Sequence, residues 1–167
     1  GDYGFKKLVP CNIGNPQALR QKPITFFRQV LSLCTFPELL DNPDVAKMFP
    51  SDAIARARNY MSMIGGGTGA YSHSMGVQGV RKEVADYIEA RDGYQADADK
   101  IFLTDGASSG VQMSLRLAIA DPADGIMVPI PQYPLYSATI ALEGGRQVDY
   151  YLDESKGWTM SVAELER

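Results

Sequence analysis

The sequence has little of what metal centres and disulfide scaffolds require. Its 167 residues include two cysteines, Cys11 and Cys34, and one histidine, His73. Neither cysteine has a His or Cys neighbour at metal-ligand spacing, and two cysteines are too few for a disulfide framework. The sequence therefore predicts two free thiols and no metal site.

Basic charge and long apolar runs are also scarce. Lys and Arg total 16 against 20 for Asp and Glu, which gives a net charge of −4, and the basic residues form no stripe. This balance disfavours a nucleic-acid or anionic-membrane partner. No stretch approaches the roughly 20 apolar residues that span a bilayer, and the first residues lack a signal-peptide pattern. We expect no nucleic-acid partner, no membrane partner and an intracellular location.

The composition that remains is that of a globular protein, with 45% hydrophobic and 22% charged residues. The chain starts at Gly1 without a methionine and stops at Arg167 inside an apparent helix, where Ser161 and Glu164 have the spacing of a capping box. We therefore expect a piece of a longer protein, cut at both ends.

The first half of the chain is predicted to be mostly helical. Apolar residues recur at helical spacing over 24–35, 51–64 and 77–91, and a short strand is expected at 7–10. The expected apolar faces are Phe27, Leu31 and Cys34 in the first helix, Ile54, Ala57, Met61 and Ile64 in the second, and Val80, Val84 and Ile88 in the third. The glycine-rich stretch 65–69 is predicted to be a linker and not a phosphate-binding P-loop, because no Gly-Lys-Ser/Thr follows it.

The second half alternates between strands and helices. The predicted order is strand 101–104, helix 107–120, strand 125–130, a helix from Pro134 to about 142, which Gly144 and Gly145 end, and strand 147–152. Successive β-α-β units imply right-handed crossovers and a mainly parallel sheet, so the predicted class is α/β.

A small-residue turn joins the predicted strand 101–104 to its helix. Gly106, Ala107 and Ser108 carry little side-chain bulk, and the free N–H groups of a first helical turn, the helix dipole and a serine hydroxyl all favour a bound phosphate. Many α/β proteins use such a turn for packing, and Ser108 could instead be the helix N-cap, so both interpretations stay open. Asp105 is expected to be a cap or turn residue.

Aromatic residues follow the predicted strand 125–130. Because ligands bind at the carboxyl ends of strands in open α/β sheets, Tyr133 could cover a flat cofactor beside the anion that Ser108 holds. We expect Ser108 and Tyr133 at the same end of adjacent strands, opening on one cleft. The alternative for Tyr133 and Tyr136 is packing over the sheet, which we favour for Tyr136.

Five segments taken in order carry a family resemblance. Together they make the chain similar, nearly end to end, to the N-terminal third of the alanine aminotransferases, pyridoxal-phosphate enzymes of fold type I. The segments are 12–17 (NIGNPQ), 69–76 (GAYSHSMG), 104–108 (TDGAS), 129–136 (PIPQYPLY) and 150–154 (YYLDE).

The resemblance implies an incomplete fold. Residues 51–167 would form the N-terminal part of the large PLP-binding domain, a mainly parallel sheet flanked by helices in a three-layer sandwich. Residues 1–50 would form an N-terminal arm and small-domain segment. The full-length parent would be a homodimer, and its location would be cytoplasmic or organellar, with mitochondria or peroxisomes as the organelles.

The resemblance also implies site residues. Ala107 and Ser108 would hold the phosphate of pyridoxal 5'-phosphate, Tyr133 would stack on its ring, and Tyr71 would reach the phosphate of the neighbouring subunit. Gly14 would lie against the substrate carboxylate, although a turn explains this glycine equally well. His73 matches no role in the family and is expected to be a solvated loop residue.

The implied activity is transamination between L-alanine and 2-oxoglutarate, which gives pyruvate and L-glutamate. In the family the Schiff-base lysine, the aspartate on the pyridine nitrogen and the arginine on the substrate carboxylate all come from downstream segments. We therefore expect no catalytic residue among the 167 residues and no activity from this piece alone. The alternatives are a glutamate–glyoxylate or other class I/II aminotransferase, or a non-catalytic aminotransferase-like sensor domain.

Overall fold

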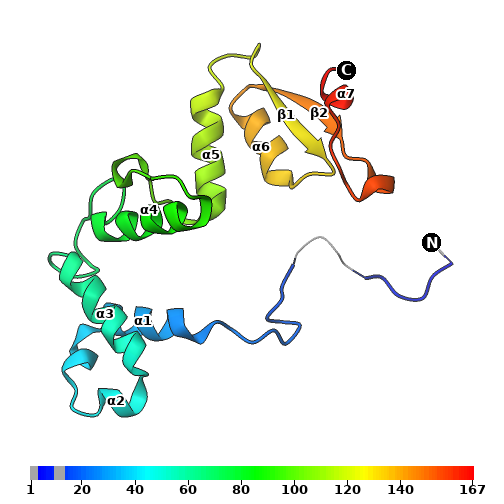
Figure 1. The fold of residues 1–167 in the computed structure, drawn as a ribbon. Coiled ribbons are helices and arrows are strands. Elements are labelled where there is room, and N and C mark those ends of the chain that lie inside the picture. The colour runs from blue at the N-terminus through cyan, green and yellow to red at the C-terminus, as the bar shows by residue number, and fades with distance from the viewer. Residues whose placement is uncertain (1–3, 10–13) are drawn as a thin grey trace. The chain divides into compact units, whose positions relative to one another are not determined.

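The chain forms two compact units in the computed structural model, which describes residues 4–9 and 14–167. Contacts divide it into a first unit, Gly1–Ile101, and a second unit, Phe102–Arg167. The first unit is helical, and the second contains the sheet (Figure 1). The predicted domain boundary at residue 50 concerns the complete family fold and stays a prediction.

The elements follow one another in this order. The first unit contains α1 (Thr25–Thr35), the 3₁₀ helix η1 (Pro37–Asp41), α2 (Val45–Met48), α3 (Ser51–Met63), α4 (Gln78–Asp92) and η2 (Ala98–Lys100). The second unit contains α5 (Gly106–Ala118), β1 (Gly125–Ile130), α6 (Pro134–Leu142), β2 (Arg146–Tyr151), η3 (Glu154–Lys156) and α7 (Val162–Leu165). The predicted longer helices and the strands at 125–130 and 147–152 are confirmed to within about two residues at their ends.

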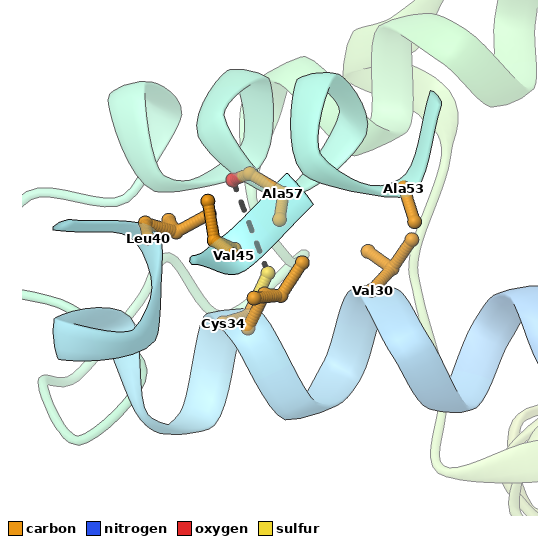
Figure 2. Packing of buried hydrophobic residues seen from close by; sticks show 7 residues of the cluster. Val30, Cys34, Leu40, Val45, Ala53 and Ala57 are labelled. Atoms are coloured by element: carbon orange, nitrogen blue, oxygen red, sulfur yellow. Dashed lines mark hydrogen bonds between the residues drawn. The ribbon is translucent and has the colours of Figure 1, made fainter. Parts of the chain in front are cut away.

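The core of the first unit lies between α1 and α3. Leu33 of α1 is completely buried, as are Ala53 and Ala57 of α3, and these small alanines let the two helices approach closely (Figure 2). The Cys34 thiol is free and buried, and it donates a weak hydrogen bond to the Ala57 carbonyl oxygen over 4.0 Å. The predicted free thiol is thus confirmed for Cys34, while Cys11 lies outside the described residues.

The predicted apolar face of α1 is wrong in part. Phe27 and Leu31 are each 60% exposed, while Val30 and Leu33 join Cys34 in the core. Apolar residues occupy more than one side of this helix, so periodicity alone allows two faces. The short alanine side chains of α3 select the face that packs.

In α4 the most deeply buried side chain is charged. Arg81 is only 3% exposed, whereas the predicted face of Val80, Val84 and Ile88 is half-buried. The Arg81 guanidinium donates to the carbonyl oxygens of Gly76 and Ala98 and to Asp99 Oδ1. These partners explain how a charge that hydropathy assigns to the surface is accommodated inside.

The second unit is a β-α-β arrangement. Strands β1 and β2 pair in parallel, from Gly125 opposite Arg146 to Ile130 opposite Tyr151, and α6 connects them. Ile119, Val128 and Ile140 form its buried cluster. α6 ends as predicted, because Gly144 adopts a left-handed φ of 78° and the Gly145 N–H donates to the Ile140 carbonyl oxygen over 3.0 Å.

The predicted strand at 101–104 is wrong for this structure. Within the described part of the chain the sheet consists of β1 and β2, and residues 101–104 pair with neither. Phe102 is 66% exposed, although a buried position was expected. An apolar run predicts burial, but a strand also needs a neighbour for its backbone hydrogen bonds, and the run itself does not supply one. Residues 7–9 of the other predicted strand likewise form none, and Pro10 lies outside the described residues.

None of the helices in the described ranges combines the length and the apolar character that crossing a membrane requires.

Candidate functional site

The start of α5 offers unused backbone donors. The Gly106 N–H donates to the Thr104 carbonyl oxygen over 2.9 Å, but within the described residues the N–H groups of Ala107 and Ser108 have no acceptor. Asp105 occupies the N-cap position, and its side chain makes no capping hydrogen bond. Among the described residues these two N–H groups therefore have no partner at the positive end of a 13-residue helix.

Ser108 is not the helix N-cap. It is the third residue of α5, its side chain is exposed, and its hydroxyl has no hydrogen-bond partner in the described part of the chain. A serine that does cap is Ser161, whose side chain accepts from the Glu164 N–H over 3.2 Å at the start of α7. The capping interpretation of Ser108 is therefore wrong, and its hydroxyl is available to a ligand.

Tyr133 lies just beyond the carboxyl end of β1, at the N-cap position of α6. The Ile130–Pro131 peptide bond that leads to it is cis. Its ring is 63% exposed and meets Tyr136 edge-on, with ring centroids 6.3 Å apart and an interplanar angle of 81°. Tyr136 packs against the buried cluster of the second unit, so the packing role favoured for it is confirmed.

Gln132 is a candidate that the sequence analysis missed. Its side-chain Nε2 donates to Ser137 Oγ over 3.0 Å, but its Oε1 is buried without a hydrogen-bond partner among the described residues. A buried acceptor without a donor is costly unless a ligand or water supplies one. The signal in the sequence was a polar side chain between Pro131 and Tyr133, directly after a predicted strand.

Tyr71 belongs to the first unit, on the loop between α3 and α4. Its side chain is fully exposed, beside a cavity of about 180 Å³ that Tyr71, Ser72 and His73 help to line. His73 is exposed as expected, and its Nδ1 accepts from the Met75 N–H over 3.2 Å, which stabilises the loop's turn.

Gly14 also belongs to the first unit and is exposed. A Cβ placed on it would meet no atom within 4 Å, so no atom of the described residues requires a glycine there. The residues that follow form a turn, in which the Leu19 N–H donates to the Pro16 carbonyl oxygen over 3.0 Å. Both the substrate-contact and the turn interpretations of Gly14 stay open.

The structure brings together only part of the predicted site. Ala107 and Ser108 are adjacent on α5, and Tyr133 belongs to the same unit. The cavity of about 240 Å³ between α5 and α6 includes none of these three; it is lined by Ser109, Gln112, Met113, Arg116, Thr139, Leu142 and Glu143. Because residues 101–104 form no strand, Ser108 and Tyr133 do not follow adjacent strands as expected, and their shared cleft stays a prediction. In the described ranges no cluster of three or more His, Cys, Asp or Glu side chains could hold a metal ion.

The available groups fit a phosphorylated aromatic cofactor. Two free N–H groups and the Ser108 hydroxyl at a helix N-terminus are donors of the kind that bind a phosphate dianion. The exposed Tyr133 ring at a strand's carboxyl end is suited to stacking on a flat ring. The second unit is thus an α/β unit in which the N-terminus of α5 offers the donors that a phosphate needs.

Comparison with known proteins agrees with this description. The model of the family "Aminotransferase class I and II" matches residues 41–167. The chain belongs to the class I and II aminotransferases, a family whose members generally use pyridoxal phosphate and act on amino acids and 2-oxo acids.

Curated relatives match nearly the whole chain. It is 60% identical over 160 residues to glutamate–glyoxylate aminotransferase 1 of Arabidopsis thaliana, a match that covers 96% of this chain and 33% of that protein. It is 57% identical over 162 residues to the probable mitochondrial alanine aminotransferase of Dictyostelium discoideum, covering 97% and 30%. The chain thus spans about a third of the length of these relatives.

Solved structures show the same fold. An aminotransferase from Escherichia coli superposes with a TM-score of 0.66 at 22% identity, covering 99% of this chain and 33% of that one. An alanine aminotransferase from Pyrococcus furiosus gives a TM-score of 0.55 at 27% identity, covering 58% and 24%. The predicted fold class, part of the larger domain of a fold type I aminotransferase, is confirmed.

Proposed function

We propose that this chain is the N-terminal third of a pyridoxal-phosphate-dependent transaminase that exchanges an amino group between L-alanine and 2-oxoglutarate, giving pyruvate and L-glutamate. The observation that carries the proposal is the uncapped start of α5, where Ala107 and Ser108 leave donors free in a family that generally uses this cofactor. Relatives named as alanine aminotransferases, at 57% and 55% identity, support the choice of substrates.

The phosphate of the cofactor is held by α5. The N–H groups of Ala107 and Ser108 and the Ser108 hydroxyl donate to its oxygens, and hydrogen bonds to a charged group contribute about 1.5–3 kcal/mol each. The bound cofactor supplies the electron sink of the reaction. The role of α5 is to bind the cofactor and to orient it.

The aromatic residues complete the binding site. Tyr133 stacks on the cofactor ring, which contributes about 0.5–1.5 kcal/mol beyond the burial of surface. Tyr71 reaches the cofactor phosphate of the neighbouring subunit in a homodimer, and its fully exposed side chain supports a contact outside its own unit. Gly14 lies against the substrate carboxylate, where a side chain would exclude the substrate.

The same cofactor site serves a second candidate reaction, transamination between glutamate and glyoxylate. The 60% identity to two Arabidopsis thaliana proteins named as glutamate–glyoxylate aminotransferases favours it. Rates with L-alanine and 2-oxoglutarate, compared with rates with L-glutamate and glyoxylate, separate the two candidates. A non-catalytic sensor would show neither rate, and the names of the relatives above lend it no support. Relatives named as mitochondrial support an organellar location, with the cytosol as the alternative.

The experiment compares Ser108→Ala and Tyr133→Ala in the full-length protein, by titration with pyridoxal 5'-phosphate and by thermal melts of the cofactor-free and loaded forms. Ser108→Ala should raise the cofactor dissociation constant about tenfold for each 1.4 kcal/mol lost, and leave the cofactor-free melting temperature unchanged. Tyr133→Ala should weaken retention and shift the absorption of the bound cofactor.

The matched control is Ser114→Ala on the same helix, because the Ser114 hydroxyl donates to the Gly110 carbonyl oxygen and faces no predicted ligand. This variant should bind the cofactor as the wild type does. If Ser108→Ala and Tyr133→Ala destabilise the cofactor-free protein equally and leave the affinity unchanged, both are packing residues and the proposed roles are wrong.

A further inference from the structure

The loop that carries Tyr71 is anchored on both sides of that residue. It runs from residue 64 to residue 77, between α3 and α4. On one side the Thr68 hydroxyl donates to the Cys34 carbonyl oxygen over 3.5 Å, and on the other the Gly76 carbonyl oxygen accepts from Arg81 Nε over 3.1 Å. Between these anchors, Tyr71 and Ser72 make no hydrogen bond within the described part of the chain. The position of Tyr71 therefore depends on what fixes the ends of the loop.

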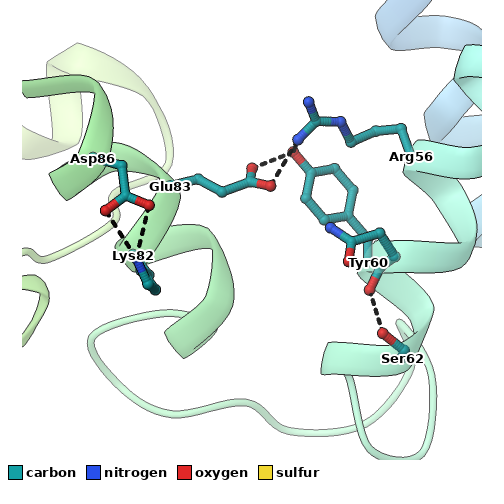
Figure 3. A network of polar contacts seen from close by, with 7 residues as sticks. Arg56, Tyr60, Ser62, Lys82, Glu83 and Asp86 are labelled. Atoms are coloured by element: carbon teal, nitrogen blue, oxygen red, sulfur yellow. Dashed lines mark hydrogen bonds and ion pairs between the residues drawn. The ribbon is translucent and has the colours of Figure 1, made fainter. Parts of the chain in front are cut away.

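A polar bridge joins α3 to α4 close to those ends. Glu83 of α4 accepts from Arg56 Nη1 through Oε1 over 2.7 Å and from the Tyr60 hydroxyl through Oε2 over 2.9 Å (Figure 3). The Arg56 guanidinium carbon lies 5.5 Å from the centroid of the Tyr60 ring. Tyr60 is about one turn before the end of α3, and Glu83 is in the second turn of α4.

The bridge is fixed to the interior of the unit. Tyr60 is half-buried and packs against the cluster between α1 and α3, so a hydrogen bond to its hydroxyl ties Glu83 to that core. Burial, followed by the hydrogen bond and the charge of Glu83, raises the pKa of the Tyr60 hydroxyl, so this group stays a donor to a higher pH than an ordinary tyrosine does.

A neighbouring ion pair on α4 differs from this bridge, because both of its partners belong to one helix. Lys82 and Asp86 pair one turn apart on the same helix over 2.8 Å, and their side chains are 69% and 59% exposed (Figure 3). This pair joins no second element, so it cannot set the distance between α3 and α4. Glu83 and Arg56 lie 27 positions apart in sequence and link two helices.

We propose that Glu83 is a positioning residue: by tying α4 to Arg56 and Tyr60 of α3, it fixes the two ends of the loop 64–77 and so orders Tyr71 for its contact with the cofactor phosphate. The inference rests on the proposed function, which gives Tyr71 that contact. Glu83 acts through the loop and touches no substrate.

The test uses Glu83→Ala, the conservative variant Glu83→Gln and the control Asp86→Asn in the full-length protein. Amide hydrogen exchange of residues 64–77 is measured without cofactor, and the dissociation constant of pyridoxal 5'-phosphate is measured by titration. Glu83→Ala should speed exchange in the loop about fivefold or more and raise the dissociation constant about threefold to tenfold. Glu83→Gln, which keeps an acceptor oxygen, should fall between it and the wild type.

A control and a milder variant separate an effect of the bridge from a general loss of stability. Asp86→Asn should change both readouts less than twofold, and exchange in α5 should be the same in every variant. If Glu83→Ala unfolds the protein, Tyr60→Phe removes only the hydroxyl from the bridge and should give the same changes at a smaller size.

Two results would overturn the proposal: unchanged exchange in the loop, or faster exchange with unchanged cofactor affinity. A wild-type protein that binds no pyridoxal 5'-phosphate would refute the proposed function itself, and this inference with it. The titration of the wild type therefore separates the two failures.

Discussion

The two units differ in how completely they bury their apolar residues. The first unit has a cluster of seven buried residues drawn from α1, η1, α2 and α3. The second unit buries only three apolar residues, Ile119, Val128 and Ile140, and leaves Leu117 89% and Met127 47% exposed. A helical unit can close a core from consecutive segments, whereas a parallel sheet needs cover on both faces.

The second unit, whose sheet is less covered, also carries the start of α5, with its N–H groups unpaired among the described residues, and the exposed Tyr133. The first unit carries Tyr71, whose side chain is fully exposed on the loop between α3 and α4. One unit of this chain is thus ordered by internal contacts, and the other leaves backbone donors and an aromatic ring at its surface.

The largest effect concerns activity. Purified as it stands, the 167-residue chain should form no pyruvate from L-alanine and 2-oxoglutarate above background, because cofactor binding without a Schiff-base lysine leaves the difficult step uncatalysed. Coupled measurement of pyruvate checks this, with the full-length protein as the positive control. Activity of the chain alone would show that the two units hold more of the active site than we infer.

The second prediction tests the closed core of the first unit. Leu33→Ala removes a completely buried side chain and should lower the stability of α1 and α3 by about 2–5 kcal/mol. Leu31→Ala, on the same helix but 60% exposed, should cost less than about 0.5 kcal/mol. Native-state hydrogen exchange of α3 amides in denaturant measures both. Equal effects of the two variants would mean that the observed helix face is not the packed one.

The third prediction tests how tightly the small core of the second unit is packed. A Cβ on Gly145 would lie 2.9 Å from Ile119 Cδ1 and 3.0 Å from its Cγ2. Gly145→Ala should therefore destabilise the unit by about 1–3 kcal/mol, and adding Ile119→Val, which removes Cδ1, should restore part of the loss. Thermal melts of the single and double variants measure the loss of stability and its partial restoration. A harmless Gly145→Ala would show that this core is loose enough to absorb a methyl group.

The smallest effect is a pH dependence of the first unit. Burial and Glu83 raise the pKa of Tyr60 above its ordinary value of 10.0, so the unfolded chain loses this proton at a lower pH than the folded one does. The contribution of Tyr60 to stability is complete below pH 10 and is lost as the pH rises through the raised value.

Spectrophotometric titration of tyrosine near 295 nm should show one late-ionising group that Tyr60→Phe removes. Alkaline unfolding should also begin less steeply in that variant. A titration curve unchanged by Tyr60→Phe would contradict the environment described for the bridge.

Much of the fold could be predicted from local pattern. Helical spacing located α1, α3, α4 and α5, and alternation of short apolar runs with helices predicted a parallel β1–β2 pair, because these periodicities are properties of the chain itself. What failed was the expected strand at 101–104, since pairing depends on a partner elsewhere in the molecule. The buried Arg81 was missed because hydropathy does not show the carbonyl acceptors that make its burial possible.

The residues alone were enough to infer the family, the order of the longer helices and of strands β1 and β2, and the residue types that suit a phosphate and a flat ring: Ala107, Ser108 and Tyr133. They left open whether Ser108 is the N-cap of its helix, and helical spacing led to a face of α1 that is wrong in part. The folded structure resolves both points, because a hydroxyl and a helix face take their roles from the groups that surround them. Those groups come from distant parts of the chain.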